Sequence, residues 1–487
     1  MSGAIKPKLP FLHFSFRKKD INEQTPSHQL KRALSAVSLV SIGIGAIIGA
    51  GLFSLTGIAA AENAGPAITL SYLLGAIACV FVGLCYSEMA SMIPFSGSAY
   101  TYSYVTMGEL VAWIVGWDLI LEYGVASATV AVSWSQYVAK ILDSWGIHLS
   151  PRFLSTPFET VTLSDGSQVQ AFFNLPAVFI ICAISLLLIK GITDSARINN
   201  IIVGIKIAVI VAVIGFGIPY IETANYQPFI PPNTGVYGHY GWSGVITGAG
   251  TVFFAYIGFD AVSTAAQEAK KPARDIPIGI LGSLAICSLA YITFSIVLTG
   301  MVRYSDMVGD ASPVITAINK TPYLWLKNLI GFGIICGFTS VILVMLLGQS
   351  RILFSMSRDG LLPKLFSTTH QKWQTPWYTQ ILLMICVSII AAVSPIQKLA
   401  HMTSIGTLFA FTIVSIGVII LRVVEPHKTR KFRIPGGFTI PILGILTCGM
   451  MMLSLDSMTW LRLILWLTIG IIIYFCYGRY NSKLQKK

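Results

Sequence analysis

Long apolar stretches separated by short polar connections run along the whole of this sequence. An apolar run of about 20 residues can cross a hydrocarbon core of ~30 Å as a helix. The pattern therefore predicts twelve membrane-spanning helices. They cover residues 35–62, 66–92, 108–140, 174–190, 198–220, 241–267, 277–301, 325–356, 377–395, 399–421, 437–455 and 459–478.

The connections between the stretches are too short to hold a separate soluble domain. The longest are residues 141–173 and 221–240, and the second is rich in Pro, Gly and Asn, which predicts a loop with at most a short surface helix. Composition agrees with this interpretation, because 54% of the 487 residues are hydrophobic and only 11% are charged. A soluble domain has about 25% charged residues, so the sequence predicts an all-α integral membrane protein.

The net charge of +13 is distributed unevenly between the two sides of the predicted bundle. If the N-terminus is inside, 25 of the 33 basic residues lie on the inner side, seven lie outside, and Lys206 lies within a stretch. Inner loops of membrane proteins carry the excess of Lys and Arg. We therefore expect both terminal tails, residues 1–34 and 479–487, in the cytoplasm, and a multi-pass protein of the plasma membrane, here a bacterial inner membrane. The charge indicates topology and some attraction to membrane lipid, not nucleic-acid binding.

The cysteines and histidines give no sign of a metal site, a cofactor or a disulfide framework. All eight cysteines lie within apolar stretches without a C-x-x-C pair, so we expect small buried apolar residues. The seven histidines are scattered, and no paired catalytic groups or H-E-x-x-H motif occur. The sequence also lacks the repeated pore-lining segment that a channel needs. A transporter is therefore favoured over an enzyme or a channel.

The first stretch contains "IGIGAIIGAGLF", residues 42–53, with four glycines. Glycine inside a helix costs roughly 0.5–1 kcal/mol relative to alanine. Gly45 and Gly49 could serve close helix packing as a G-x-x-x-G pair, or the helix could break here. The sixth stretch is interrupted similarly by Gly248, Gly250 and Gly258. Paired interruptions at matching positions indicate a transporter built from two inverted repeats, here residues 35–220 and 241–421, and favour the break.

Four segments resemble the amino acid–polyamine–organocation (APC) superfamily, and most closely its bacterial cationic amino acid transporter branch. They are "GIGAIIGAGLF", "PFSGSAYTYSYVTMGELVAWIVGWDLILEYGVA", "FFAYIGFDAVSTAAQEAKKPARDIPIGI" and "GQSRILFSMSRDGLLPKLF". The resemblance runs from about residue 30 to 480. It implies a LeuT-type fold with a 5+5 inverted repeat and two additional C-terminal helices in residues 437–478, which makes twelve transmembrane helices.

The resemblance also implies how an α-amino acid would be bound. Freed backbone amides of Gly49, Ala50 and Gly51 would hold its carboxylate. Ala50 stands where many relatives have Ser or Thr, so a hydroxyl contact is missing. Phe254 is either a gate over the substrate or ordinary packing. The backbone carbonyls expected to accept from the ammonium are those of Ile47, Phe254, Ala255 and Ile257.

Lys206 lies in the middle of the fifth stretch, where a charge costs at least ~2.5–3.5 kcal/mol. By the resemblance, it takes the place of the sodium ion of coupled relatives, and it could also load and release a proton. The alternatives are a structural lysine and one that extends its ammonium to the membrane surface.

Three acidic residues and one methionine complete the predicted site. Asp118 and Glu122 are four residues apart and share a helix face. Asp118 is nearer the cytosolic end and could face water, whereas Glu122 could receive a cationic side chain, tune Lys206, or bond to a neighbouring helix. Asp260 follows the second interruption and has either a gating or a structural role, and Met345 could line the side-chain pocket. In the cytosolic segment after the sixth stretch, Gln267 stands where relatives more commonly have the first of two acidic residues. Glu268 remains available for a salt bridge.

These features predict a secondary active, sodium-independent amino acid transporter without a cofactor. It would act by proton-coupled symport or by exchange, and cationic L-amino acids are favoured by the branch resemblance. The alternatives are a broad neutral amino acid permease or exchanger, and an amino acid-sensing transceptor without net flux. A small single-span membrane partner is compatible with the sequence.

Overall fold

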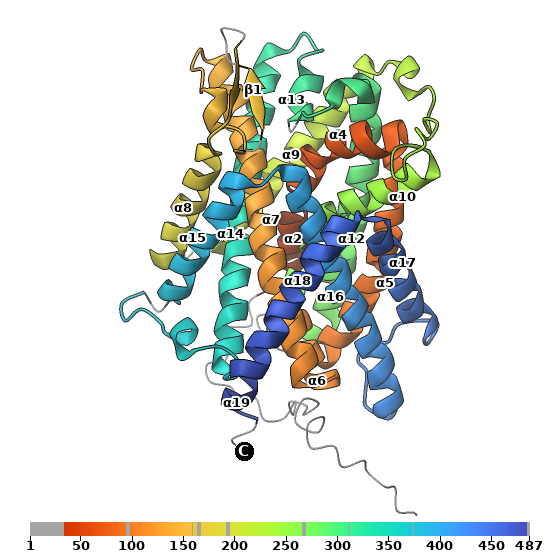
Figure 1. Cartoon of the computed structure of the whole chain (residues 1–487). Helices are drawn as coiled ribbons and strands as arrows, with labels where there is room; N and C mark the ends of the chain where they lie inside the picture. The colour runs from red at the N-terminus through yellow and green to blue at the C-terminus, as the bar shows by residue number, and fades with distance from the viewer. Residues whose placement is uncertain are drawn as a thin grey trace, which may run out of the picture.

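The computed structural model describes residues 34–93, 98–157, 159–162, 167–190, 195–264, 269–310, 312–373 and 375–484. Its helices run side by side through the molecule, with a small hairpin and α13 at one end and α6 and α19 at the other (Figure 1). The helices are α2 (Ala36–Ile47), α3 (Ala50–Phe53), α4 (Leu55–Ala59), α5 (Ile68–Met92), α6 (Ser98–Thr106), α7 (Glu109–Ser144), α8 (Leu175–Lys190), α9 (Ser195–Gly217), α10 (Gly241–Val252), α11 (Ala261–Thr264), α12 (Pro272–Met301), α13 (Pro313–Ile318), α14 (Leu324–Arg358), α15 (Trp377–Val393), α16 (Ile396–Val424), α17 (Thr439–Ser454), α18 (Ser457–Ile473) and α19 (Arg479–Asn481).

Eight of the described helical segments are long and apolar enough to cross a membrane, and four apolar helices are shorter. The shorter ones are α2, α8, α15 and α17. All overlap the predicted apolar stretches. The segment Leu55–Met92 joins the end of the first stretch to the second through a π-helical turn at Ala60–Ala64. The chain is therefore a multi-span, helical membrane protein.

The central and peripheral helices differ sharply in burial. Of the most apolar 18-residue window, 89% is buried in Gly241–Ser263 and 72% in Glu109–Ser144, but only 22% in Ser457–Asn481. α7 packs against α14 and α16, and α12 packs against α5 and α2. This arrangement encloses the two interrupted segments.

Some of the predicted connections contain regular structure. Residues 141–173 include an antiparallel pair of strands, β1 (Thr160–Thr162) and β2 (Gln168–Gln170), with Val161 opposite Val169. α6 and α13 also lie between predicted stretches. The 221–240 connection holds a short 3₁₀ turn at Thr223–Tyr226, as expected for a loop.

The expectation that all cysteines are buried is wrong in part. All eight are free thiols, and Cys79, Cys85, Cys287 and Cys448 are buried. Cys386 and Cys476 are exposed instead, on the outer surfaces of peripheral helical segments, where an apolar thiol suits a lipid-facing position.

Candidate functional site

The first helix breaks at the predicted glycines. α2 ends at Ile47, Ile48 is extended (φ −73°, ψ 110°), and α3 begins at Ala50. In the described part of the chain, the amides of Gly49, Ala50 and Gly51 make no hydrogen bond, and bonding resumes from Leu52 N to Gly49 O at 3.2 Å. Three adjacent free N–H groups at the start of a helical segment form a site for an anion.

The two interrupted segments touch each other through glycine. A Cβ on Gly51 would lie 2.3 Å from the Cα of Ala255, and one on Gly258 would lie 2.9 Å from the backbone of Ala46. Gly258 also has φ +116°, which L side chains rarely adopt. Only glycine permits these approaches. Gly49 is less constrained, because a Cβ there would lie 3.2 Å from the Val341 side chain.

The second interruption follows α10. A 3₁₀ turn covers Phe253–Tyr256, Ile257 is extended (φ −63°, ψ 135°), and α11 begins at Ala261. The carbonyls of Ile47 and Ala255 come together here, 3.0 and 2.9 Å from the hydroxyl of Tyr291. The carbonyl of Phe254 instead accepts from Ile257 N at 3.3 Å. Of the four predicted acceptors, the carbonyls of Ile47 and Ala255 share one donor and that of Phe254 has another, whereas that of Ile257 accepts no hydrogen bond in the described part of the chain.

Lys206 reaches from α9 to the first break. Its side chain is 1% exposed, and its Nζ donates to the carbonyls of Gly45 at 2.6 Å and Ile48 at 2.8 Å. Its alkyl chain passes Gly337 of α14, whose added Cβ would lie 3.2 Å from Cε. This excludes the alternative in which the ammonium reaches the membrane surface. The positive charge lies at the C-terminal end of α2, where the helix dipole favours a cation.

Asp260 lies at the second break and is 1% exposed. Its Oδ2 accepts from the hydroxyls of Tyr123 at 2.8 Å and Ser98 at 3.3 Å. Among the described residues no Lys or Arg forms an ion pair with Asp260. The donors to Asp260 are thus hydroxyl groups from α7 and α6.

Asp118 and Glu122 are deeper than the sequence suggested. They are 0% and 1% exposed, and within the described ranges none of their carboxyl oxygens has a hydrogen-bond partner. The interpretation of Asp118 as a residue facing water is wrong, because α16 covers it at Gly406, whose Cβ would lie 3.0 Å from Oδ1. Glu122 lies beside the side chain of Thr407 on the neighbouring helix α16, so the alternative of a bond to another helix stays open.

Three further predicted residues are Phe254, Met345 and Glu268. Phe254 is 6% exposed and, unlike Phe253, forms no aromatic pair in the described part of the chain. Met345 is 2% exposed on α14, one turn from the Val341 that contacts Gly49. Glu268 lies outside the described residues.

Sequence reasoning missed three tyrosines at the breaks. Besides Tyr291, Tyr72 donates to the carbonyl of Gly51 at 2.9 Å, and Tyr137 donates to that of Phe53 at 2.6 Å. A buried tyrosine hydroxyl needs a partner, so tyrosines inside apolar stretches were the available signal. The sequence alone does not say which backbone oxygen they meet.

Comparisons with known proteins identify the family. The sequence model of the family described as "Amino acid permease" matches residues 34–476. The chain is 43% identical to the branched-chain amino acid permease BcaP of Bacillus subtilis, over 97% of this chain and 99% of that protein. The methylthioribose transporter of the same organism is also 43% identical, over the same shares. The vacuolar cationic amino acid transporter 2 of Arabidopsis thaliana is 38% identical over 84% of this chain and 62% of its own length. The chain therefore belongs to the amino acid permease family of the APC superfamily, a family of membrane transporters.

Proposed function

We propose that the chain is a secondary active transporter of α-amino acids, with its substrate site between the two helix interruptions. The observation that carries this proposal is the direct contact of the breaks at Gly51 and Ala255. The first break contains the free amides of Gly49–Gly51, and the carbonyls of Ile47 and Ala255 meet at the hydroxyl of Tyr291. A zwitterion needs both kinds of group, because its carboxylate requires hydrogen-bond donors and its ammonium requires acceptors.

The proposed architecture is the LeuT-type inverted repeat of residues 35–220 and 241–421, with residues 437–478 at the periphery. It is supported by the position of both interruptions, each in the first predicted helix of its repeat. The basic residues support a topology with both termini in the cytoplasm of a plasma-membrane protein. A sensing role without net flux and a small single-span partner remain alternatives to test.

We infer that Lys206 makes transport independent of sodium. Its ammonium already supplies a positive charge to the carbonyls at the end of α2, 2.6 and 2.8 Å away. A fixed cation there leaves no need for a bound metal ion. If Lys206 also carries the coupling proton, Lys206→Ala abolishes the response of uptake to an imposed proton gradient while substrate still binds. Undiminished proton-driven uptake in that variant contradicts the coupling role.

Two substrate classes have separate support. Cationic amino acids are supported by Glu122, a buried carboxyl group without a partner in the described structure, and by the similarity to cationic amino acid transporters. Neutral branched-chain amino acids are supported by the apolar side chain of Val341 beside the first break, with buried Met345 one turn further along α14, and by the similarity to BcaP.

Uptake into proteoliposomes tests the proposal and separates these classes. Labelled arginine, leucine and methylthioribose are offered in sodium-free buffer, with and without an inward proton gradient. Gradient-stimulated uptake of an amino acid supports coupled symport, and uptake only into preloaded vesicles supports exchange. The arginine-to-leucine ratio selects the substrate class. Uptake of methylthioribose that neither amino acid competes with contradicts the proposal.

A further inference from the structure

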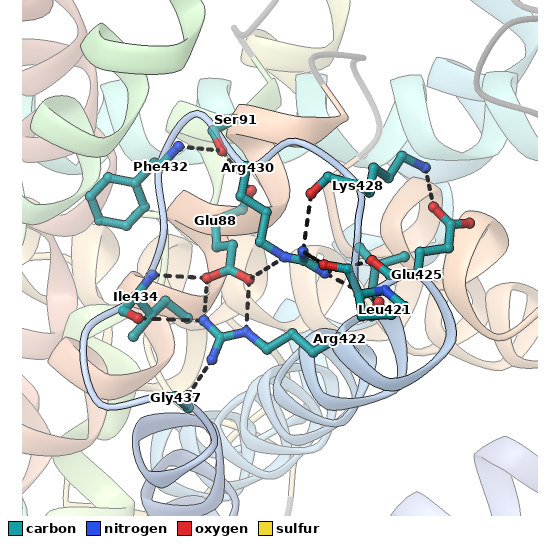
Figure 2. A network of polar contacts seen from close by, with 11 residues as sticks. Glu88, Ser91, Leu421, Arg422, Glu425, Lys428, Arg430, Phe432, Ile434 and Gly437 are labelled. Atoms are coloured by element: carbon teal, nitrogen blue, oxygen red, sulfur yellow. Dashed lines mark hydrogen bonds and ion pairs between the residues drawn. The ribbon is translucent and has the colours of Figure 1, made fainter.

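The buried carboxylate of Glu88 holds the connection between α16 and α17 in place through hydrogen bonds. We call residues 425–438 the strap. Glu88, on the last turns of α5, accepts from Arg422 Nε at 3.0 Å and Nη2 at 2.5 Å, and from the backbone N–H of Ile434 at 2.9 Å (Figure 2). Arg422 also donates to the carbonyl of Gly437. The side chains of Glu88 and Arg422 are 2% and 7% exposed, so the pair is desolvated and its geometry is fixed.

A second arginine fills the space between the strap and α16. Arg430 lies 3.4 Å from Glu88, and its Nη2 donates to the carbonyls of Leu421 at 3.2 Å and Glu425 at 3.1 Å (Figure 2). These carbonyls belong to the C-terminal end of α16, where a cation is favoured by the exposed acceptors. Arg422 and Arg430 are therefore internal parts of the strap, not free surface charges.

The strap beyond Arg430 alternates between inward and outward residues. Arg430 and Phe432 are half-buried and Ile434 is buried, and the backbone N–H of Phe432 donates to Ser91 at 3.3 Å. Lys431 and Arg433 are exposed and have no hydrogen-bond or ion-pair partner in the part of the chain that the structure describes. Residues 422–433 contain five Lys and Arg residues, and the acidic residues among and beside them are two, Glu425 and Glu88. The balance is three positive charges.

Exposed apolar side chains flank this basic segment on both sides. Val423 and Val424, just before the strap, are 66% and 57% exposed. Phe438, Ile442 and Leu446 are 45%, 45% and 61% exposed and are spaced four residues apart, so they form one stripe along α17. Cations beside an apolar surface are the combination that binds the interface of an anionic membrane.

We propose that the strap is a docking surface for anionic phospholipid. Lys431 and Arg433 meet the phosphate of the headgroup, and the acyl chains lie along the stripe of Phe438, Ile442 and Leu446. The pinning by Glu88 holds the two cations in place before the lipid arrives, so little ordering is needed on binding. A soluble acidic partner would not account for the apolar stripe that begins where the strap ends.

Lipid counting by native mass spectrometry tests this proposal on the full chain. The delipidated protein is titrated with phosphatidylglycerol and, separately, with phosphatidylcholine. The test variant is K431Q/R433Q. The matched control is K364Q/K372Q, which removes the same charge from another exposed basic segment. Both variants change exposed side chains, and thermal unfolding confirms that they fold.

Wild type is expected to prefer phosphatidylglycerol, and added salt should weaken that preference. Each cation that meets the bound headgroup contributes about fivefold in affinity, so K431Q/R433Q should bind phosphatidylglycerol about 25-fold more weakly. The control should stay within about twofold, because it leaves the strap intact. Equal binding by K431Q/R433Q and wild type, or an equal loss in the control, overturns the proposal. Equal binding of soluble glycerol 1-phosphate overturns the assignment of the site to a lipid.

Discussion

The two helix interruptions present the same physical problem, but a basic side chain lies at the first and an acidic side chain at the second. At the first, the carbonyls of Gly45 and Ile48 at the end of α2 accept from the Lys206 ammonium. At the second, the carboxyl group of Asp260 accepts from the hydroxyls of Tyr123 and Ser98. In a membrane interior, backbone groups freed by a break must find partners within the protein. The charge that suits a partner depends on the end of the helical segment: unpaired C-terminal carbonyls favour a cation, and unpaired N-terminal amides favour an anion.

The sources of these partners also differ. Lys206 comes from one helix, α9, and makes both of the contacts to the carbonyls of Gly45 and Ile48. Tyr123 and Ser98 come from α7 and α6 and divide the contacts at the second. The carbonyls of Gly45 and Ile48 therefore depend on a single side chain, whereas Asp260 can lose one donor and keep another.

Adding a side chain where the two breaks touch should have the largest effect. Gly51→Ala places a Cβ against the Ala255 backbone, so the segments must separate, at a cost of about 3 kcal/mol or more in the free energy of unfolding. Denaturant unfolding in detergent measures the change. Gly204→Ala is the control, because nothing lies within 4 Å of a Cβ there. Equal stabilities of the two variants would contradict the direct contact of the breaks.

Removing the cation should weaken the first break alone. Lys206→Met keeps the length of the side chain but leaves two buried carbonyls unpaired, so we expect about 2 kcal/mol of destabilisation. The same unfolding measurement applies, with exposed Lys398→Met as the control. A change no larger than that of the control would show that the ammonium does not stabilise the end of α2.

Removing one donor from the second break should have a smaller effect. Tyr123→Phe takes away the 2.8 Å bond to Asp260, and we expect about 1.5 kcal/mol of destabilisation. Ser98→Ala removes the longer 3.3 Å bond and should cost about 0.5 kcal/mol. The reverse order would assign the main support of Asp260 to α6 instead of α7.

A modest single effect is expected at Tyr291, the residue that both breaks share. Tyr291→Phe removes one hydroxyl, at a cost of about 1 kcal/mol. This variant is most informative in double-mutant cycles with Gly51→Ala and Lys206→Met. Changes in unfolding free energy at residues of one network couple by at least about 0.5 kcal/mol. Additive free energies in both cycles would show that Tyr291 acts independently of the breaks.

The sequence predicted the breaks because glycine inside an apolar stretch has few other uses. Gly49, Gly51 and Gly258 stand where the backbone changes direction or touches another backbone. Lys206 was predictable for a similar reason, since a charge in a span needs a partner. Its acceptors were not predictable, because α9 and the end of α2 are brought together only by tertiary packing.

The depth of Asp118 and the role of Tyr291 could not be predicted in this way. Distance along a helix from its cytosolic end does not determine burial when another helix crosses over it, as α16 does at Gly406. Tyr291 resembles any aromatic residue in an apolar stretch until its hydroxyl is placed between two carbonyls. Both errors concern contacts between helices, which apolar periodicity does not encode.

The position of Tyr291 limits the number of hydrogen-bond donors that reach the two breaks. Its hydroxyl carries one hydrogen and lies within bonding distance of two acceptors, the carbonyls of Ile47 and Ala255. At any instant it satisfies one of them, and the other keeps a lone pair unfilled. An ammonium group brings three hydrogens. The two carbonyls thus share a single donor, and an ammonium group has enough hydrogens to donate to both of them at once.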